Sequence, residues 1–152
     1  MNVSRRDVLA LGGGAVAALS LGVSVSSVAV AKGDLVADAI SKFSGGAEPK
    51  SGKVSLTTPE IAENGNTVPI SFSVDSPMTS DNYVASVLLL ADGNPNPGVA
   101  TFNFSAMSGE ASAATRIRLA KTQNVIAVAK MSDGSVFMDK KQIKVTIGGC
   151  GG

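Results

Sequence analysis

The sequence contains no histidine and no tryptophan, and it contains a single cysteine, Cys150. Without histidine the chain cannot form a Ser-His-Asp or Cys-His catalytic pair, and it lacks the commonest ligand of protein-bound metals. One cysteine forms neither an internal disulfide bond nor a thiolate cluster around a metal. We therefore expect a protein that is not an enzyme, with no catalytic residues, no metal site and no cofactor.

The charges are balanced and exclude another class of protein. Residues 1–31 hold two of the 13 basic and one of the 12 acidic residues, so the remaining 121 residues carry 11 of each. A nucleic-acid-binding domain needs a clustered basic surface, which this composition does not indicate. A length of 121 residues is enough for one domain with a sizeable core.

The first 31 residues have the composition of a secretory signal peptide. Arg5 and Arg6 form a positive start, and residues 9–30 contain only apolar residues, glycine and serine. Ala29-Val30-Ala31 then matches a small-x-small cleavage site. The apolar stretch is also long enough for a membrane anchor, but the cleavage site favours removal of the segment.

The type of signal predicts the compartment. Ser4-Arg5-Arg6-Asp7-Val8-Leu9 resembles the twin-arginine motif, with Val8 where phenylalanine is usual. Such signals direct bacterial export, although the departure leaves the general secretory route open. We expect residues 1–31 to be a twin-arginine-type signal peptide and the mature protein to begin near Lys32. The mature protein is then periplasmic, with no membrane attachment.

Residues 34–43 predict a short helix at the start of the mature chain. Apolar side chains fall on one face at helical spacing, and Gly45-Gly46 supplies the end signal. Two interpretations of this helix stay open. It is either a docking helix for a partner or a helix that packs on its own domain.

From residue 53 onward the pattern changes to short strands separated by turns. Residues 67–74 alternate between apolar and polar, whereas residues 83–91 and 125–131 are apolar on both faces, as in strands covered on both sides. Further strands are expected over residues 99–104, 114–119, 135–138 and 143–147. We predict a mainly β fold over residues 32–147, an immunoglobulin-like antiparallel β-sandwich with a short N-terminal helix.

The turn over residues 92–98 presents two alternatives. Asp92, Asn94 and Asn96 have the spacing that opens a calcium-binding loop. No acidic residue follows at the far end of the loop, and asparagine, glycine and proline are common in turns. We expect a solvated turn without a metal.

The last five residues form a Gly-rich arm around the only thiol. Gly148 and Gly149 precede Cys150, and Gly151 and Gly152 follow it. An unpaired cysteine in an exported protein indicates a reactive thiol or an intermolecular bond. The four glycines leave a slim backbone that can enter a narrow channel and take many orientations. We predict a flexible arm over residues 148–152, with covalent cargo on Cys150 and a reach of roughly 10 Å from the last strand.

The ending Val145-Thr146-Ile147-Gly148-Gly149-Cys150-Gly151-Gly152 resembles the C-terminus of SoxY, the carrier family of the periplasmic Sox thiosulfate-oxidising system. The resemblance implies that Cys150 bears sulfur intermediates as covalent adducts and that the chain forms a heterodimer with SoxZ. It also implies three transient partners. SoxAX, a haem enzyme, couples thiosulfate oxidatively to the thiol, and SoxB, a metal-dependent hydrolase, releases sulfate. In some organisms SoxCD, a molybdenum-haem dehydrogenase, oxidises the remaining sulfur.

Two other functions remain as alternatives. The terminal Gly151-Gly152 is also similar to ubiquitin-like sulfur carriers, which form a thiocarboxylate on the terminal carboxylate by ATP-dependent cytoplasmic chemistry. The export signal and the position of Cys150 argue against that chemistry. The second alternative is a structural protein in which Cys150 forms an intermolecular disulfide.

Overall fold

The computed structural model describes residues 32–149, and in this range the fold is mainly β, as predicted. A three-stranded sheet has the order β1-β3-β6, and a five-stranded sheet has the order β2-β8-β7-β4-β5. The elements are helix α2 (Lys32–Ser44), strands β1 (Val54–Thr57), β2 (Ile61–Asn64), β3 (Val68–Val74), β4 (Val84–Ala91) and β5 (Gly98–Asn103), the 3-10 turn η1 (Ala106–Ser108), and strands β6 (Ala111–Ile117), β7 (Gln123–Met131) and β8 (Val136–Ile147).

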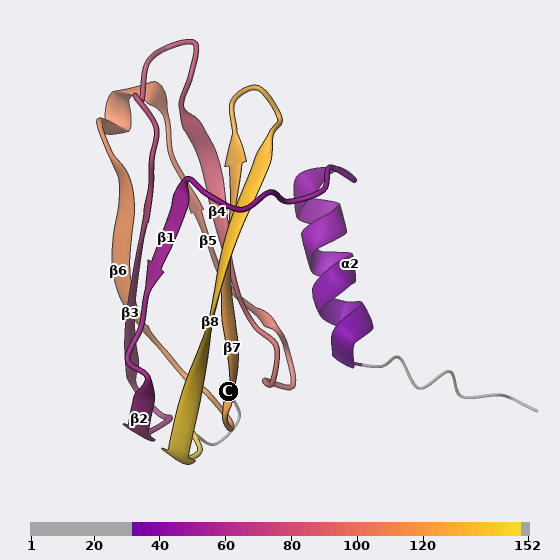
Figure 1. Cartoon of the computed structure of the whole chain (residues 1–152), viewed down its shortest axis with the longest axis vertical. Helices are drawn as coiled ribbons and strands as arrows, with labels where there is room; N and C mark the ends of the chain where they lie inside the picture. The colour runs from indigo at the N-terminus through magenta and orange to yellow at the C-terminus, as the bar shows by residue number, and fades with distance from the viewer. Residues whose placement is uncertain (1–31, 150–152) are drawn as a thin grey trace, which may run out of the picture.

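The molecule is built in three layers, which are visible edge-on in Figure 1. The two sheets face each other, and α2 lies on the outer face of the five-stranded sheet. The main core fills the space between the sheets and includes Val68, Phe72, Leu89 and Leu119. A smaller cluster joins the helix to the other face of the five-stranded sheet.

The periodicity of each strand matches its place in these layers. Along β3 the side chains alternate between buried and outward positions, because only one face of the small sheet is covered. Phe72 on this strand packs edge-on against Phe102 and Phe104, with ring centroids 5.2 Å and 6.3 Å apart. Strands β4 and β7 are apolar on both faces, since one face meets the small sheet and the other meets α2.

The position of α2 decides between the two interpretations of the predicted helix. Val36 is buried against the sheet, and Ala39, Ile40 and Phe43 pack on the same cluster. The helix therefore packs on its own domain. Its end follows the sequence signal, since Gly45 and Gly46 both have positive φ and the Gly46 N–H donates to the carbonyl oxygen of Ser41 at 3.0 Å.

Two expectations about the strands were wrong. Residues 136–138 and 143–147 belong to one continuous strand, β8, because residues 139–142 continue the pairing with β7. The segment after residue 60 contains a strand, β2, that the sequence analysis missed. This strand runs parallel to β8, with Ala62 opposite Val145 and Asn64 opposite Ile147, so the sandwich is not wholly antiparallel.

No helix within residues 32–149 is long and apolar enough to cross a membrane.

Candidate functional site: the base of the C-terminal arm

Strand β8 carries the chain to the end of the sandwich where β2 also ends, opposite the β7–β8 hairpin (Figure 1). Gly148 and Gly149 follow β8 and belong to the described residues. Cys150, Gly151 and Gly152 lie outside them, so the predicted cargo residue is located here through its immediate neighbour. Any chemistry at Cys150 begins one residue beyond Gly149, at a distance of about 3.8 Å between α-carbons.

Three backbone hydrogen bonds hold the start of the arm. The Gly65 N–H donates to the carbonyl oxygen of Ile147 at 2.7 Å, and the Leu119 N–H donates to the carbonyl oxygen of Gly65 at 2.8 Å. The Gly149 N–H then donates to the carbonyl oxygen of Leu119 at 2.9 Å. Gly65, Leu119 and Gly149 are buried. The arm therefore begins as a fixed part of the sandwich, and we call these contacts of Gly65, Leu119, Ala120, Gly148 and Gly149 the glycine seam.

The seam is too narrow for side chains. A Cβ at Gly65 would collide with the carbonyl oxygen of Leu119 and lie 2.7 Å from the backbone nitrogen of Gly149. A Cβ at Gly148 would collide with the carbonyl oxygen of Ala120, and a Cβ at Gly149 would lie 2.7 Å from the carbonyl oxygen of Gly65. None of the three glycines has positive φ, so each is required by close backbone approach rather than by backbone conformation.

A buried polar pair holds the β6–β7 connection (residues 118–122) on which the arm rests. The side-chain amide of Asn94 donates to the carbonyl oxygen of Arg118 at 2.9 Å, and its oxygen accepts from the Ala120 N–H at 3.0 Å. The Gln123 amide donates to the same Asn94 oxygen at 2.8 Å and to the carbonyl oxygen of Lys121 at 3.1 Å. Both side chains are only 4% exposed, so their hydrogen bonds stabilise the connection in a dry environment.

The role of Asn94 corrects the expectation of a solvated turn. Its side chain points inward, whereas Asn96, two residues later, is exposed and accepts from the Gly98 N–H at 3.2 Å. Asp92 is occupied as well, because its carboxylate accepts from the backbone and the side chain of Asn124 at 2.8 Å and 2.7 Å. The amide and carboxylate oxygens of the loop are therefore committed to the fold.

The connection is also tied to β8 just before the arm. The Val145 N–H donates to the hydroxyl oxygen of Thr122 at 3.0 Å. On either side of Leu119 and Ala120, the side chains of Arg118 and Lys121 are exposed. The backbone that holds the arm is thus flanked in sequence by two exposed cations.

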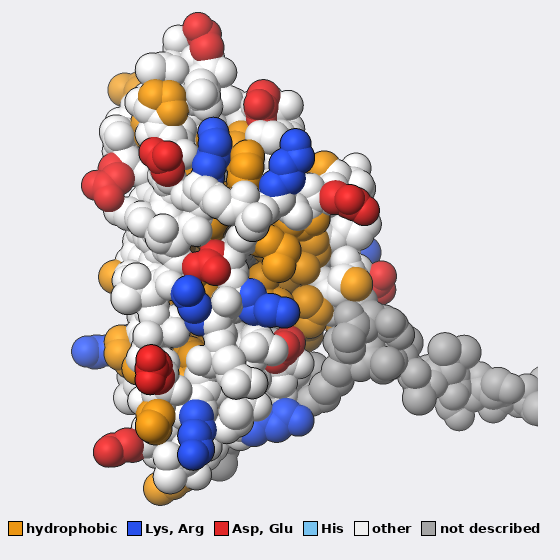
Figure 2. Space-filling model, viewed as in Figure 1, with side chains coloured by type: hydrophobic (Ala, Val, Ile, Leu, Met, Phe, Trp, Pro, Cys, Tyr) orange, Lys and Arg blue, Asp and Glu red, His pale blue; other side chains and the backbone are white. Residues whose placement is uncertain are grey.

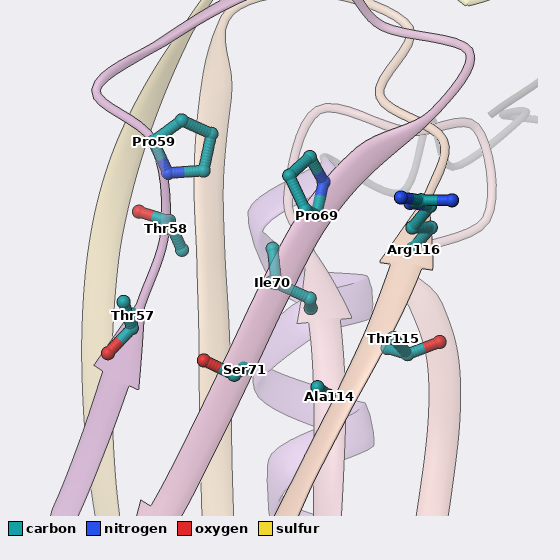
Figure 3. A pocket seen from close by; sticks show the side chains of 9 residues that line it. All are labelled: Thr57, Thr58, Pro59, Pro69, Ile70, Ser71, Ala114, Thr115 and Arg116. Atoms are coloured by element: carbon teal, nitrogen blue, oxygen red, sulfur yellow. The ribbon is translucent and has the colours of Figure 1, made fainter.

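Two hollows elsewhere on the surface are lined by few reactive side chains. The first, about 660 Å³ in volume, lies on the outer face of the three-stranded sheet (Figure 3). Its lining consists of Thr57, Thr58, Pro59, Pro69, Ile70, Ser71, Ala114, Thr115 and Arg116. Arg116 is the one charged residue in this lining, so the hollow contains no acid–base pair. Within residues 32–149, no three histidine, cysteine, aspartate or glutamate residues gather as a metal site would require.

The second hollow is an apolar groove between α2 and the start of β8, where hydrophobic side chains gather on the face shown in Figure 2. Ile40, Pro49 and Met138 line it. It lies at a distance from the glycine seam, because Met138 stands near the beginning of β8 and the seam follows its end.

The residues that hold the base of the arm give no functional signal in the sequence. Gly65 lies in Glu63-Asn64-Gly65-Asn66, which indicates only a turn. Asn94 and Gln123 occur in polar segments where exposed side chains are the normal expectation. A buried pair from two separate loops leaves no periodic signal in the sequence, so only the structure reveals this network.

Comparisons with known proteins agree with the fold and extend to the arm. A family model described as "Sulfur oxidation protein SoxY" matches residues 40–150. Among solved structures, the sulfur carrier protein SoxY from Chlorobium limicola f thiosulfatophilum matches with a TM-score of 0.64 and 25% identity. The match covers 75% of this chain and 94% of that one. No curated protein matches the chain by sequence.

The same fold occurs in proteins of another class. A superoxide reductase (neelaredoxin) from Ignicoccus hospitalis matches with a TM-score of 0.56 and 19% identity, covering 74% of this chain and 91% of that one. At this identity the likeness concerns the fold alone.

Proposed function

The chain belongs to the SoxY family and so has a sulfur-carrier role in the Sox system, and we propose that Cys150 holds the cargo as a covalent adduct. The observation that carries the proposal is the extent of the family match, which runs through the last strand and the glycine seam to residue 150. Gly149 is hydrogen-bonded to the sandwich, and the only thiol of the chain follows it directly in the sequence. The thiol of Cys150 needs no catalytic residues from this chain, because the partner enzymes supply them.

The loading step forms a bond between the sulfur of Cys150 and the sulfane sulfur of thiosulfate. The thiol loses its proton, and the reaction releases two electrons, which the haem enzyme SoxAX would accept one at a time. The product is a thiosulfonate on the cysteine, with a negative charge at its free end. SoxB then hydrolyses the S–S bond to the sulfonate. Water supplies the fourth oxygen of the released sulfate and loses two protons, and the electron pair of the broken bond stays on the sulfane sulfur, which leaves a persulfide on Cys150. In organisms that have SoxCD, this enzyme oxidises the remaining sulfane sulfur.

The remaining parts of the proposal concern place and partners. Residues 1–31, outside the described range, act as a twin-arginine-type signal, and the mature chain works in the periplasm as a heterodimer with SoxZ. Arg118 and Lys121, exposed beside the base of the arm, support an anionic cargo. The absence of histidine from the whole sequence supports a carrier that is acted on by enzymes rather than an enzyme.

Intact mass spectrometry of protein purified from thiosulfate-grown cells tests the function. We expect a sulfur-containing adduct that a thiol reductant removes, and peptide mapping should assign it to Cys150. The Cys150→Ser variant, purified in parallel, should carry no adduct.

The same spectra separate the alternatives. A modification on the carboxylate of Gly152 would indicate thiocarboxylate chemistry. A disulfide between two copies that persists in active cells, with no sulfur adduct, would indicate a structural role. Either result would replace the proposed function.

A further inference from the structure

We propose that Gly65 is a positioning residue for Cys150, because it fastens the base of the arm to the sandwich so that the cargo is presented from Gly149 onward. The inference rests on the carrier function proposed above, whereas the contacts that support it join residues 65, 119, 147 and 149. Gly65 precedes the cysteine by 85 positions in the sequence and contacts the arm directly. It lies in the turn between β2 and β3, which belong to different sheets.

Gly65 contacts the chain on both sides of the arm's first residue. Its N–H donates to Ile147, the last residue of β8, and an added Cβ would lie 2.7 Å from the nitrogen of Gly149. Its carbonyl oxygen accepts from Leu119, whose own carbonyl oxygen accepts from Gly149. Together these three hydrogen bonds link Gly65, Leu119 and Gly149 to one another and to the end of β8. Displacement of any one of these residues therefore weakens the other hydrogen bonds.

The consequence is a shorter free arm than the sequence suggests. If the chain were unattached after Ile147, Cys150 could lie roughly 10 Å from the end of β8. With Gly149 attached, the α-carbon of Cys150 follows at about 3.8 Å from a held residue. With the seam closed, a partner enzyme must bring its active site to this end of the sandwich. Positioning of the thiol by the fold then contributes to the rate of each transfer, because orientation of reacting groups lowers the barrier.

The first test uses the unaltered protein. Amide hydrogen exchange measured by NMR should show a protected N–H at Gly149, with exchange slowed at least about 100-fold relative to an unstructured glycine. Exchange at the unstructured rate would overturn the proposal without any variant.

The second test uses Gly65→Ala, with Gly98→Ala as the matched control. A Cβ at Gly65 collides with Leu119, whereas a Cβ at Gly98 lies at an ordinary 3.6 Å from Asn96 Oδ1. A nitroxide attached to Cys150, the only cysteine, reports the motion of the arm by EPR. In Gly65→Ala we expect narrower EPR lines and amide exchange at Gly149 that is faster by at least about tenfold, the effect of losing roughly one hydrogen bond. The Gly98→Ala control should show neither change.

Gly149→Ala approaches the same contact from the other side. Its Cβ meets the carbonyl oxygen of Gly65, so the EPR effects of Gly65→Ala and Gly149→Ala should be non-additive in the double variant. Independent, additive effects would mean that the two glycines do not act through one contact. If Gly65→Ala fails to fold, the exchange measurement on the unaltered protein still decides.

A functional readout separates positioning from folding. Folded Gly65→Ala should react with a small thiol reagent at the normal rate but accept sulfur from the reconstituted loading enzyme at a rate lower by about tenfold or more. An unchanged loading rate would overturn the positioning role. Failure of the unaltered protein to accept sulfur, with Gly149 still protected, would instead reject the carrier function and leave the seam intact.

Discussion

The N–H of Gly149 donates to the carbonyl oxygen of Leu119 at 2.9 Å, which ties the residue before Cys150 to the connection between the two sheets. A hydrogen bond between buried backbone groups is maintained by the same packing that maintains the core. The position of Gly149, and with it the start of the proposed cargo residue, is therefore linked to the integrity of the β6–β7 connection.

Cys150→Ser should leave the stability of the domain nearly unchanged. Within residues 32–149 the arm is held by hydrogen bonds between backbone groups, which a change of the Cys150 side chain does not remove, and the strand pattern ends at Ile147. We expect a change in the free energy of unfolding within about 0.5 kcal/mol, as for a substitution outside the core. Urea denaturation measures it, and association with SoxZ should be equally unaffected. A loss of several kcal/mol would mean that the thiol is packed in the core.

Gly149→Val should retain thiol reactivity toward a small reagent and lose most turnover with the partner enzymes. The valine Cβ would lie 2.7 Å from the carbonyl oxygen of Gly65, and its branched side chain would restrict the backbone. Misplacement of the thiol by about 1 Å predicts a loss on the order of 100-fold in thiosulfate-dependent cytochrome c reduction.

The control for Gly149→Val is Gly98→Val, which adds the same side chain in ordinary space. Thiol titration of both variants checks that the cysteine remains available, and Cys150→Ser sets the zero of the assay. Full turnover by Gly149→Val would show that close packing at the base of the arm does not matter for transfer.

Asn94→Ala should destabilise the domain by about 1–3 kcal/mol, the cost of leaving buried groups without hydrogen-bond partners. The substitution removes the partners of the Arg118 carbonyl and the Ala120 N–H. Asn96→Ala, an exposed change in the same loop, should cost less than about 0.5 kcal/mol. Equal effects of the two substitutions in urea denaturation would contradict a buried role for Asn94.

The isolated protein should form a disulfide dimer in air through Cys150. Two thiols lose their protons and an electron pair to oxygen, and the glycines on both sides of Cys150 add no side chains that would hinder the approach of a second copy. Non-reducing electrophoresis should show a dimer that reductant abolishes and that Cys150→Ser does not form. An oxidised sample that stays monomeric, with its thiol still titratable, would count against accessibility.

The mature protein should begin at or near Lys32 in the periplasm. The reason is the pair Arg5-Arg6, the apolar segment that follows, and the small residues of Ala29-Val30-Ala31. N-terminal sequencing of the periplasmic protein measures the start. Replacement of both arginines by lysine should leave the precursor unexported, and a periplasmic pool that retains Met1 would disprove removal of the segment.

The sequence alone determined the class of fold and singled out Cys150 as the residue proposed to hold the cargo. Alternation over residues 67–74 and unbroken apolar runs over residues 83–91 and 125–131 report local burial, because a side chain's environment repeats with the period of its strand. Cys150 between two pairs of glycines needs no tertiary context to stand out. The helical spacing of apolar residues likewise predicted the short helix over residues 34–43. It did not predict the sheet on which the helix packs.

Only the tertiary structure decided what holds the arm in place. The parallel pairing of β2 with β8 and the hydrogen bonds of Asn94 join segments that are far apart in the chain. Gly65 illustrates the reason, because a glycine in a polar turn and a glycine in a narrow backbone contact are identical in sequence. Close approach of two backbones depends on the packing of both sheets, and that packing has no local pattern from which it can be predicted.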